Sequence, residues 1–270
     1  MTTRARTPAP GLAAALAAAL AATLALGACA HPAAQVAPAP IASDRPSYST
    51  GTAITPVGFP LLEAGLTYYR ADGVNLLAVG EATLRVGVAP RAELRLTAPS
   101  YNMLRPDPFR ADGLGDAGAG VKVTLKEGPA ETGTFEPGLA LLAGVSLPTG
   151  SQAFRSDRAL PSASLIAGWS LTDRVGLTAN LIWAQASSGG GTVDTYAAVG
   201  GVSFSHTDKF GSFYEVFSTR GPSGDWDDPY LTGGVTYLLA PRFQLDAHWG
   251  FRTSGPGDAY YAGTGFSRRF

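Results

Sequence analysis

The sequence predicts an all-β protein that folds as a closed, antiparallel transmembrane β-barrel of about 12 strands. Three observations carry this prediction. Apolar residues recur at every second position in short bursts from Leu61 to the end of the chain. The links between the bursts are alternately short and long. The chain opens with a segment typical of exported proteins.

Composition narrows the classes of partner but does not decide between a soluble and a membrane protein. The 270 residues include 20 Lys and Arg against 21 Asp and Glu, and charged residues make up only 15%. This balance gives no strong net field, so a nucleic-acid partner is not predicted. The hydrophobic share of 45% suits a soluble core as well as a membrane surface.

Residues 1–28 are predicted to be a signal peptide. Arg4 and Arg6 form a basic start, an apolar run covers residues 11–27, and small residues follow. The alternative is a transmembrane anchor, because the run approaches the length that spans a bilayer. The Ala-rich run and its cleavage-like end favour the signal peptide.

The single cysteine of the chain, Cys29, directly follows this run. The sequence Leu26-Gly27-Ala28-Cys29 resembles a bacterial lipobox, which predicts cleavage before Cys29 and lipidation of its sulfur. The alternative is ordinary cleavage after Ala30, which fits the small-x-small rule. With one cysteine, the mature chain has no pair for a disulfide.

Residues 29–58 are rich in Pro and Ala without a period, which predicts a flexible tether, and residues 59–270 form the predicted barrel. The predicted strands are 61–70, 78–88, 91–101, 117–126, 137–147, 162–171, 175–185, 195–205, 210–219, 229–239, 243–252 and 259–270.

Charged residues in these strands share the face opposite the leucines. An Arg or Lys that faced lipid near the bilayer midplane would cost about 2–4 kcal/mol, so this face is predicted to line the lumen. The predicted lumen-lining residues are Glu63, Glu81, Arg85, Glu93, Arg95, Lys122, Glu215, Asp246, His248 and Arg252. Two groups are expected, one of Glu81, Arg85, Glu93 and Arg95, and one of Glu215, Asp246, His248 and Arg252.

The links predict which end of the barrel faces which compartment. Short turns with a basic residue follow the even-numbered strands, at 88–91, 171–174, 206–209 and 239–242, whereas most links after odd-numbered strands are longer. Short turns are periplasmic in outer-membrane barrels. An even strand count then places both barrel termini in the periplasm. The link 127–136 departs from the rule, because it is long where a short turn is expected.

Residues for catalysis or metal binding are not evident. Of three histidines, His31 lies in the tether, His206 in a turn and His248 on the lumen face. No metal-ligand spacing or phosphate loop is present, so no cofactor and no enzymatic activity are predicted. A barrel enzyme such as a phospholipase would need a Ser–His pair on the lipid-facing rim, and no histidine occupies a lipid-facing strand position.

Gly113-Leu114-Gly115-Asp116 and the segment Val145–Gly150 (VSLPTG), with the turn 171–174 and the terminal Phe270, resemble one known family. It is the family of outer-membrane transporters associated with the MetA pathway of phenol degradation, and the resemblance covers roughly residues 60–270. It implies a twelve-stranded type of barrel and transport of aromatic or other hydrophobic compounds. No residue role can be carried over, and the lipobox-like Cys29 departs from the family.

The sequence therefore predicts an outer-membrane channel or facilitator for small solutes, aromatic or hydrophobic ones among them. The alternatives are a structural or adhesion barrel with a plugged lumen and, with less support, a barrel enzyme. The expected partners are outer-membrane lipid, a small-molecule solute and the barrel-assembly machinery, for which Phe270 on the last strand resembles the assembly signal.

Overall fold

The computed structural model describes residues 41–105, 110–129, 131–221, 224–255 and 257–270. The predicted signal peptide, Cys29 and the first part of the predicted tether lie outside the described residues.

The described chain is built from β-strands that form one sheet. The strands are β1 (Leu61–Ala71), β2 (Val74–Ala89), β3 (Ala92–Ala98), β4 (Tyr101–Leu104), β5 (Ala111–Leu114), β6 (Ala117–Lys126), β7 (Gly138–Leu147), β8 (Leu160–Ser170), β9 (Val175–Ser188), β10 (Gly191–Ser205), β11 (Phe210–Arg220), β12 (Tyr230–Ala240), β13 (Phe243–Arg252) and β14 (Ala259–Arg269).

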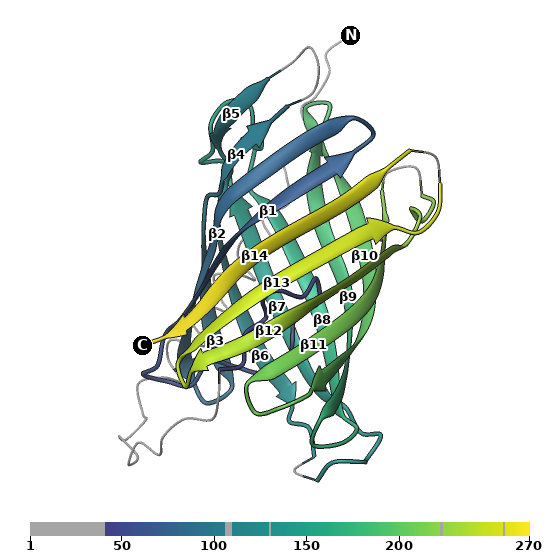
Figure 1. Ribbon diagram of the computed structural model, residues 1–270. Helices are drawn as coiled ribbons and strands as arrows, with labels where there is room; N and C mark the ends of the chain where they lie inside the picture. The colour runs from purple at the N-terminus through teal and green to yellow at the C-terminus, as the bar shows by residue number, and fades with distance from the viewer. Residues whose placement is uncertain (1–40, 106–109, 130, 222–223, 256) are drawn as a thin grey trace. The chain divides into compact units, whose positions relative to one another are not determined.

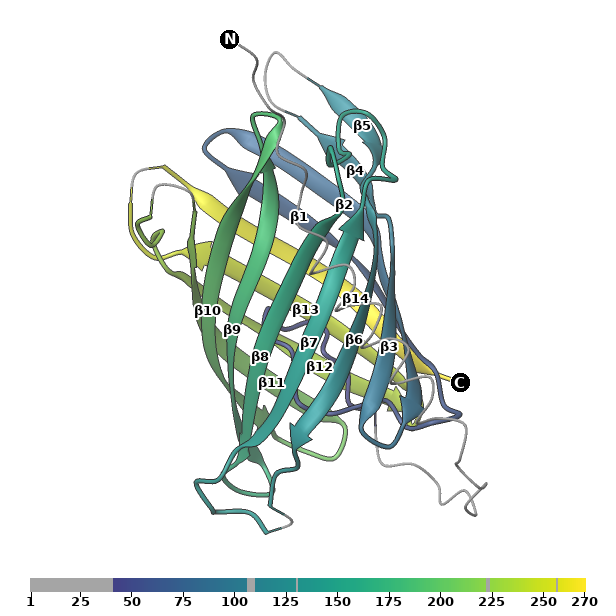
Figure 2. The same ribbon diagram turned by 180° about the vertical axis from the view of Figure 1, so that it is seen from behind.

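The sheet closes on itself. Neighbouring strands are antiparallel, and β1 pairs with β2 on one side and with β14 on the other (Figures 1 and 2). Closure leaves no wall strand without a partner, which is the condition for a sheet in hydrocarbon, where backbone groups have no water to bind. No helix in the described part of the chain is long and apolar enough to cross a bilayer.

Two pairs of short strands each make one strand of the wall. β3 and β4 both pair with β2, and they are separated only by Pro99 and Ser100. β5 pairs with β4 and β6 pairs with β3, with a break at Gly115 and Asp116. Counted this way, the barrel has 12 strands, so the predicted fold class is confirmed.

The predicted strands differ from the observed ones mainly at one end of the barrel. The predicted loop 102–116 contains β5 and most of β4, which form a hairpin that continues the wall at this end (Figure 1). The predicted loop 186–194 is a tight turn at Gly189 and Gly190, whose φ angles are 55° and 82°. Both segments are polar and glycine-rich, so alternation of apolar residues, on which the prediction relied, is weak there.

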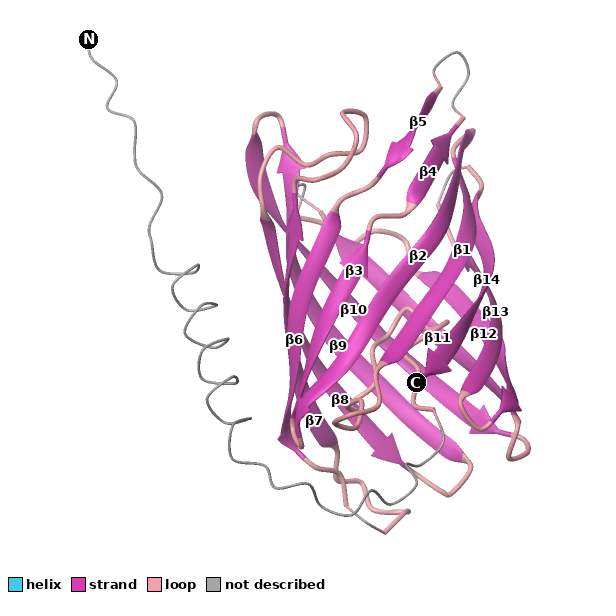
Figure 3. Ribbon diagram, turned by 90° about the vertical axis from the view of Figure 1, so that its left-hand side faces the viewer, coloured by secondary structure: helices cyan, strands magenta, loops and turns pink. Residues whose placement is uncertain are grey.

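The two ends of the barrel are named here by their connections. At the turn end, tight links join β2 to β3, β8 to β9, β10 to β11 and β12 to β13. Leu61 at the start of β1 pairs with Arg269 at the end of β14, so the barrel also begins and finishes at the turn end. The opposite end, the loop end, carries β4, β5 and the link between β7 and β8 (Figure 3).

Candidate functional site

Residues 41–57, called the inner segment, lie inside the barrel in the half nearer the turn end (Figures 1 and 3). They contact opposite parts of the wall. The amide of Tyr48 donates to Glu215 of β11 at 2.9 Å, and the amide of Thr55 donates to Glu93 of β3 at 2.7 Å. The inner segment therefore crosses the lumen and is fixed on both sides.

Residues 41–58 differ here from the flexible tether that their composition predicts. The lumen supplies charged and polar groups that satisfy the backbone of the segment, so a sequence without its own period becomes ordered. No pattern within residues 41–58 predicts these partners.

Glycines on the inward face of the wall make room for the inner segment. A Cβ atom at Gly87 would meet the carbonyl carbon of Pro56 at 2.8 Å. A Cβ at Gly65 would meet Arg45 Cζ at 2.5 Å, and one at Gly265 would meet Arg45 Nε at 2.6 Å. Glycines that interrupt a polar inward face are thus the sequence signal that could have indicated close approach of another chain segment.

A charged cluster holds the start of the inner segment. Asp44 lies 3.2 Å from Nη1 of Arg85 and 3.4 Å from Nζ of Lys122, and it also binds Arg95. Glu93 contacts the same three cations, at 3.0 Å for Arg85, 3.4 Å for Arg95 and 3.5 Å for Lys122. The side chains of Arg85, Glu93 and Lys122 are fully buried.

Arg45 binds a neighbouring part of the wall. Its guanidinium lies 3.2 Å from Asp246 of β13 and 4.0 Å from Glu81 of β2. It also donates to the carbonyl of Thr264 at 3.3 Å. Asp44 thus meets cations of the wall and Arg45 meets carboxylates of the wall, so the inner segment is electrostatically complementary to the strands that it contacts.

Ser43, Ser49 and Thr50 complete the attachment of the inner segment. The Ser43 hydroxyl donates to Glu63 at 2.9 Å and lies 2.6 Å from the hydroxyl of Ser267. Ser49 binds Glu215. The Thr50 amide donates to the Asn180 side chain at 2.7 Å, and the Asn180 amide donates back to the Thr50 carbonyl at 3.0 Å.

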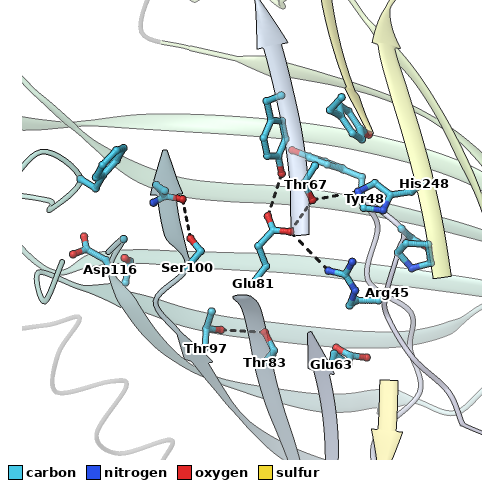
Figure 4. Close-up of a pocket in the computed structure, with 18 of the residues that line it drawn as sticks. Arg45, Tyr48, Glu63, Thr67, Glu81, Thr83, Thr97, Ser100, Asp116 and His248 are labelled. Carbon is cyan, nitrogen blue, oxygen red and sulfur yellow. Dashed lines mark hydrogen bonds and ion pairs between the residues drawn. The ribbon is translucent and has the colours of Figure 1, made fainter. Parts of the chain in front are cut away.

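A cavity of about 960 Å³ lies beside the inner segment (Figure 4). Residues of the inner segment from Arg45 to Tyr48 form part of its lining. One side of the cavity is polar, with Glu81 accepting a hydrogen bond from Thr67 at 2.7 Å and from Tyr69 at 3.3 Å.

The other side of the cavity carries a ladder of aromatic rings. Phe217 stacks on Tyr48 of the inner segment at 3.8 Å between centroids and on Tyr230 at 5.1 Å. Tyr230 lies 6.5 Å from Tyr261, which lies 5.7 Å from Tyr69. These rings come from β1, β11, β12 and β14 and from the inner segment, and all five line the cavity. We call them the aromatic ladder.

The predicted lumen residues fall into contacts that differ from the predicted groups. Arg85, Glu93 and Arg95 are together, as expected, but Lys122 and Glu63 join them while Glu81 contacts Arg45 instead. The second group does not form around its own members. Asp246 pairs with Arg45, Arg252 with Asp72 at 3.2 Å, and Glu215 binds the inner segment.

His248, the remaining member of the second predicted group, lies 3.4 Å from the Thr67 hydroxyl and 5.9 Å from the ring of Tyr261.

The predicted groups of lumen residues differ from the observed contacts because some of the partners lie outside the strands. The inner segment supplies Asp44 and Arg45 as partners, and strand alternation cannot place a segment that is not a strand.

The two glycine-containing motifs of the sequence meet at the loop end. Asp116 accepts hydrogen bonds from the amides of Gly150 at 2.8 Å and Ser156 at 2.9 Å. The Ser151 amide donates to the carbonyl of Leu114 at 2.8 Å. The link between β7 and β8 is thereby held against the break between β5 and β6, with Phe154 lining the cavity. The motifs fix a loop and carry no evident chemistry.

We expect replacement of Asp116 by Ala to release the link between β7 and β8, because two backbone amides lose their acceptor. Hydrogen exchange at Gly150 and Ser156 should accelerate about tenfold or more, since a net hydrogen bond to a charged group contributes about 1.5–3 kcal/mol. The matched control is Asp112→Ala, which removes an exposed partner of Arg105 at the same end. Unchanged exchange in the Asp116 variant would contradict this account.

The same contacts give a pH dependence. Burial raises the pKa of Asp116, but hydrogen bonds from Ser156 and Gly150 outweigh it and lower the pKa overall. The stabilisation of the loop is therefore present above the ordinary Asp value of about 3.9 and is lost as the pH falls through the lowered value.

A Ser–His contact occurs outside the lumen. Nε2 of His206 lies 2.7 Å from the hydroxyl of Ser212, and the His206 ring packs between Phe204 and Phe210 at the turn end. Ser212 lies on the outward face of β11, because Glu215 and Phe217 of that strand face the lumen. A histidine in a turn can thus reach an outward serine, although no histidine occupies a lipid-facing position within a predicted strand. Within the described residues, no group of three or more His, Cys, Asp or Glu side chains could hold a metal ion.

Comparison with known proteins agrees with this fold. The sequence model of the family described as "Putative MetA-pathway of phenol degradation" matches residues 43–270. The chain belongs to this family. The match begins at Ser43, so it includes most of the inner segment as well as the barrel. No curated protein sequence matches the chain.

Two solved structures show the same architecture. The COG4313 outer-membrane channel from Pseudomonas putida F1 is 14% identical with a TM-score of 0.58, and the match covers 81% of this chain and 98% of that one. The NanC porin is 9% identical with a TM-score of 0.52, and the match covers 77% of this chain and all of that one. At these identities the likeness establishes the fold, which is that of outer-membrane barrels.

Proposed function

We propose that this protein is an outer-membrane channel for small aromatic solutes, closed in its resting state by the inner segment. The observation that carries the proposal is the cavity beside the aromatic ladder, where a chain segment and not a barrel strand supplies part of the lining. A segment held by hydrogen bonds and ion pairs can leave the lumen without unfolding the wall.

The aromatic ladder supports the class of solute. Planar rings prefer offset stacks with centroids about 4.5–7 Å apart, and neighbouring rungs of the ladder at 5.1, 5.7 and 6.5 Å lie in this range. Tyr48 stacks on the ring of Phe217, so displacement of Tyr48 would free one face of Phe217 for a solute ring. The neighbour described as an outer-membrane channel agrees with transport, and the family description names phenol, an aromatic compound.

In this proposal the turn end faces the periplasm, so the chain enters and leaves the barrel wall on the periplasmic side and the inner segment closes the lumen from that side. Residues 1–28 act as the signal peptide, Cys29 is lipidated, and Phe270 is read by the barrel-assembly machinery. Outer-membrane lipid surrounds the wall, and the charged lumen residues line the solute path.

A flux assay in liposomes tests the proposal. Phenyl glucoside and methyl glucoside differ in the aromatic ring and cross bilayers poorly without a protein. We expect the protein to pass the phenyl compound faster, and a Tyr230→Leu/Tyr261→Leu variant to lose this preference, because stacking contributes about 0.5–1.5 kcal/mol per ring pair. The control is Tyr237→Leu, a tyrosine exposed on the outer surface.

Equal rates for the two glucosides would contradict the aromatic preference. No flux, even after release of the inner segment, would contradict the channel and favour the alternative, a structural barrel with a plugged lumen. That alternative is favoured by the many polar contacts that fix the inner segment. Hydrolysis of phospholipid by the unchanged protein, and its loss in a Ser212→Ala variant, would support the enzymatic alternative. We expect no hydrolysis by either protein.

A further inference from the structure

We infer that the position held by the Asp44 carboxylate is a carboxylate-binding site of the lumen, so that solutes bearing a carboxylate compete with the inner segment for it. This inference rests on the proposed channel function and assigns it a further chemical class of solute.

Without Asp44, the wall residues at this site have one carboxylate fewer than they have cations. The cations Arg85, Arg95 and Lys122 come from β2, β3 and β6, whereas the wall supplies two carboxylates to them, Glu93 and Glu63. Asp44 of the inner segment is the third carboxylate and contacts all three cations. When the inner segment leaves, the three cations Arg85, Arg95 and Lys122 keep two wall carboxylates, so one positive charge stays uncompensated.

The geometry of the site suits a carboxylate better than a spherical anion. Asp44 Oδ1 accepts a hydrogen bond from the amide of Gly51 at 2.9 Å, while Oδ2 binds the three cations. Two oxygens of one planar group thus serve different donors. Because Gly51 belongs to the inner segment, a carboxylate that replaces Asp44 alone meets both sets of donors, whereas a solute that displaces the whole segment meets the three cations of the wall. A chloride ion can occupy only one of these two positions, and charge-assisted hydrogen bonds to a carboxylate are about twice as strong as neutral ones.

A solute also has a way to reach the site. A second cavity of about 430 Å³ is lined by Asp44 and Arg95, and it shares Arg45, Thr83 and Thr97 with the larger cavity beside the aromatic ladder. Gly118, Gly120 and Gly144 line this second cavity, so it has room for the body of a small acid. Asp44 and Arg95 are the members of the cluster that keep some exposure, at 13% and 11% of their side chains.

Chemical rescue tests the inference on the full chain. In Asp44→Ala the carboxylate is removed and space is left for one. We expect the thermal midpoint of this variant to fall, and sodium acetate to restore it at concentrations about tenfold lower than sodium chloride at equal ionic strength, because acetate can reproduce both sets of contacts. The unchanged protein should show no difference between the two salts.

The matched control is Asp44→Ala/Lys122→Met, in which one of the three cations is also missing and acetate should lose its advantage. If Asp44→Ala does not fold in chloride, the variant is refolded in the presence of acetate or of chloride, and acetate should give the higher yield of folded protein. Equal effects of acetate and chloride, or an undiminished acetate effect in the Lys122 variant, would overturn the inference.

Measurements of solute flux through Asp44→Ala distinguish the carboxylate site from the channel proposal. Acetate rescue together with faster permeation of benzoate than of benzyl alcohol glucoside through Asp44→Ala supports both. Rescue without any flux keeps the carboxylate site and refutes the channel. Flux without rescue keeps the channel and refutes the site.

Discussion

Oxidation of a Ser43→Cys/Ser267→Cys variant is expected to close the channel, and reduction to reopen it. The two serine hydroxyls lie 2.6 Å apart, which places the new sulfurs close to the length of about 2.05 Å for a disulfide. The C-terminal end of the inner segment already continues into β1, so the disulfide would also fix its N-terminal end. A disulfide contributes about 2–4 kcal/mol, enough to reduce the released fraction tenfold or more. The measurement is single-channel current in planar bilayers.

The controls are the two single-cysteine variants, all with Cys29→Ser so that no other thiol is present. Neither should respond to the oxidant. If the oxidised double variant conducts as well as the reduced one, the inner segment does not control the lumen and the proposal of a movable closure is wrong.

Replacement of Arg85 by Met is expected to cause the largest loss of stability of any single change in the lumen. Arg85 is fully buried and contacts Glu93 at 3.0 and 3.1 Å, Glu63 at 3.0 Å and Asp44 at 3.2 Å. Its removal leaves buried carboxylates with fewer cations, and breaking such a pair typically costs about 3–5 kcal/mol. The free energy of unfolding would be measured by urea titration in micelles, followed by tryptophan fluorescence.

The matched control is Arg91→Met at the turn between β2 and β3. Arg91 lies 3.8 Å from Glu127 and both side chains are more than half exposed, so we expect a change of at most about 1 kcal/mol. Similar losses in the two variants would show that the buried cluster contributes no more than a surface pair.

Strand alternation was sufficient to predict most of the wall. Where one face meets lipid and the other a polar lumen, the side-chain period of two is strict, and the predicted span 243–252 coincides with β13. The prediction was weaker at the loop end, where β5 (Ala111–Leu114) was taken as part of a loop. Such short, polar strands are stabilised by pairing with β4, which no local pattern encodes.

Partners within the lumen were harder to predict than the wall. The sequence placed Arg85, Glu93 and Arg95 on one face, because neighbouring strands in register bring such residues together. It did not indicate that Asp246 and Glu215 bind a segment outside the strands.

The barrel and the two faces of its strands can be predicted from the sequence, because alternation, turn chemistry and the cost of charge in lipid are local or nearly local effects. The position of residues 41–57 inside the lumen follows from the tertiary structure. Asp44, Arg45 and Tyr48 are distant in sequence from Lys122, Asp246 and Phe217, and they become neighbours only when the barrel closes around them. Closure excludes water from these groups, and buried polar groups require hydrogen-bond partners within the protein. The segment is ordered by supplying these partners, although its sequence shows no strand or helix pattern.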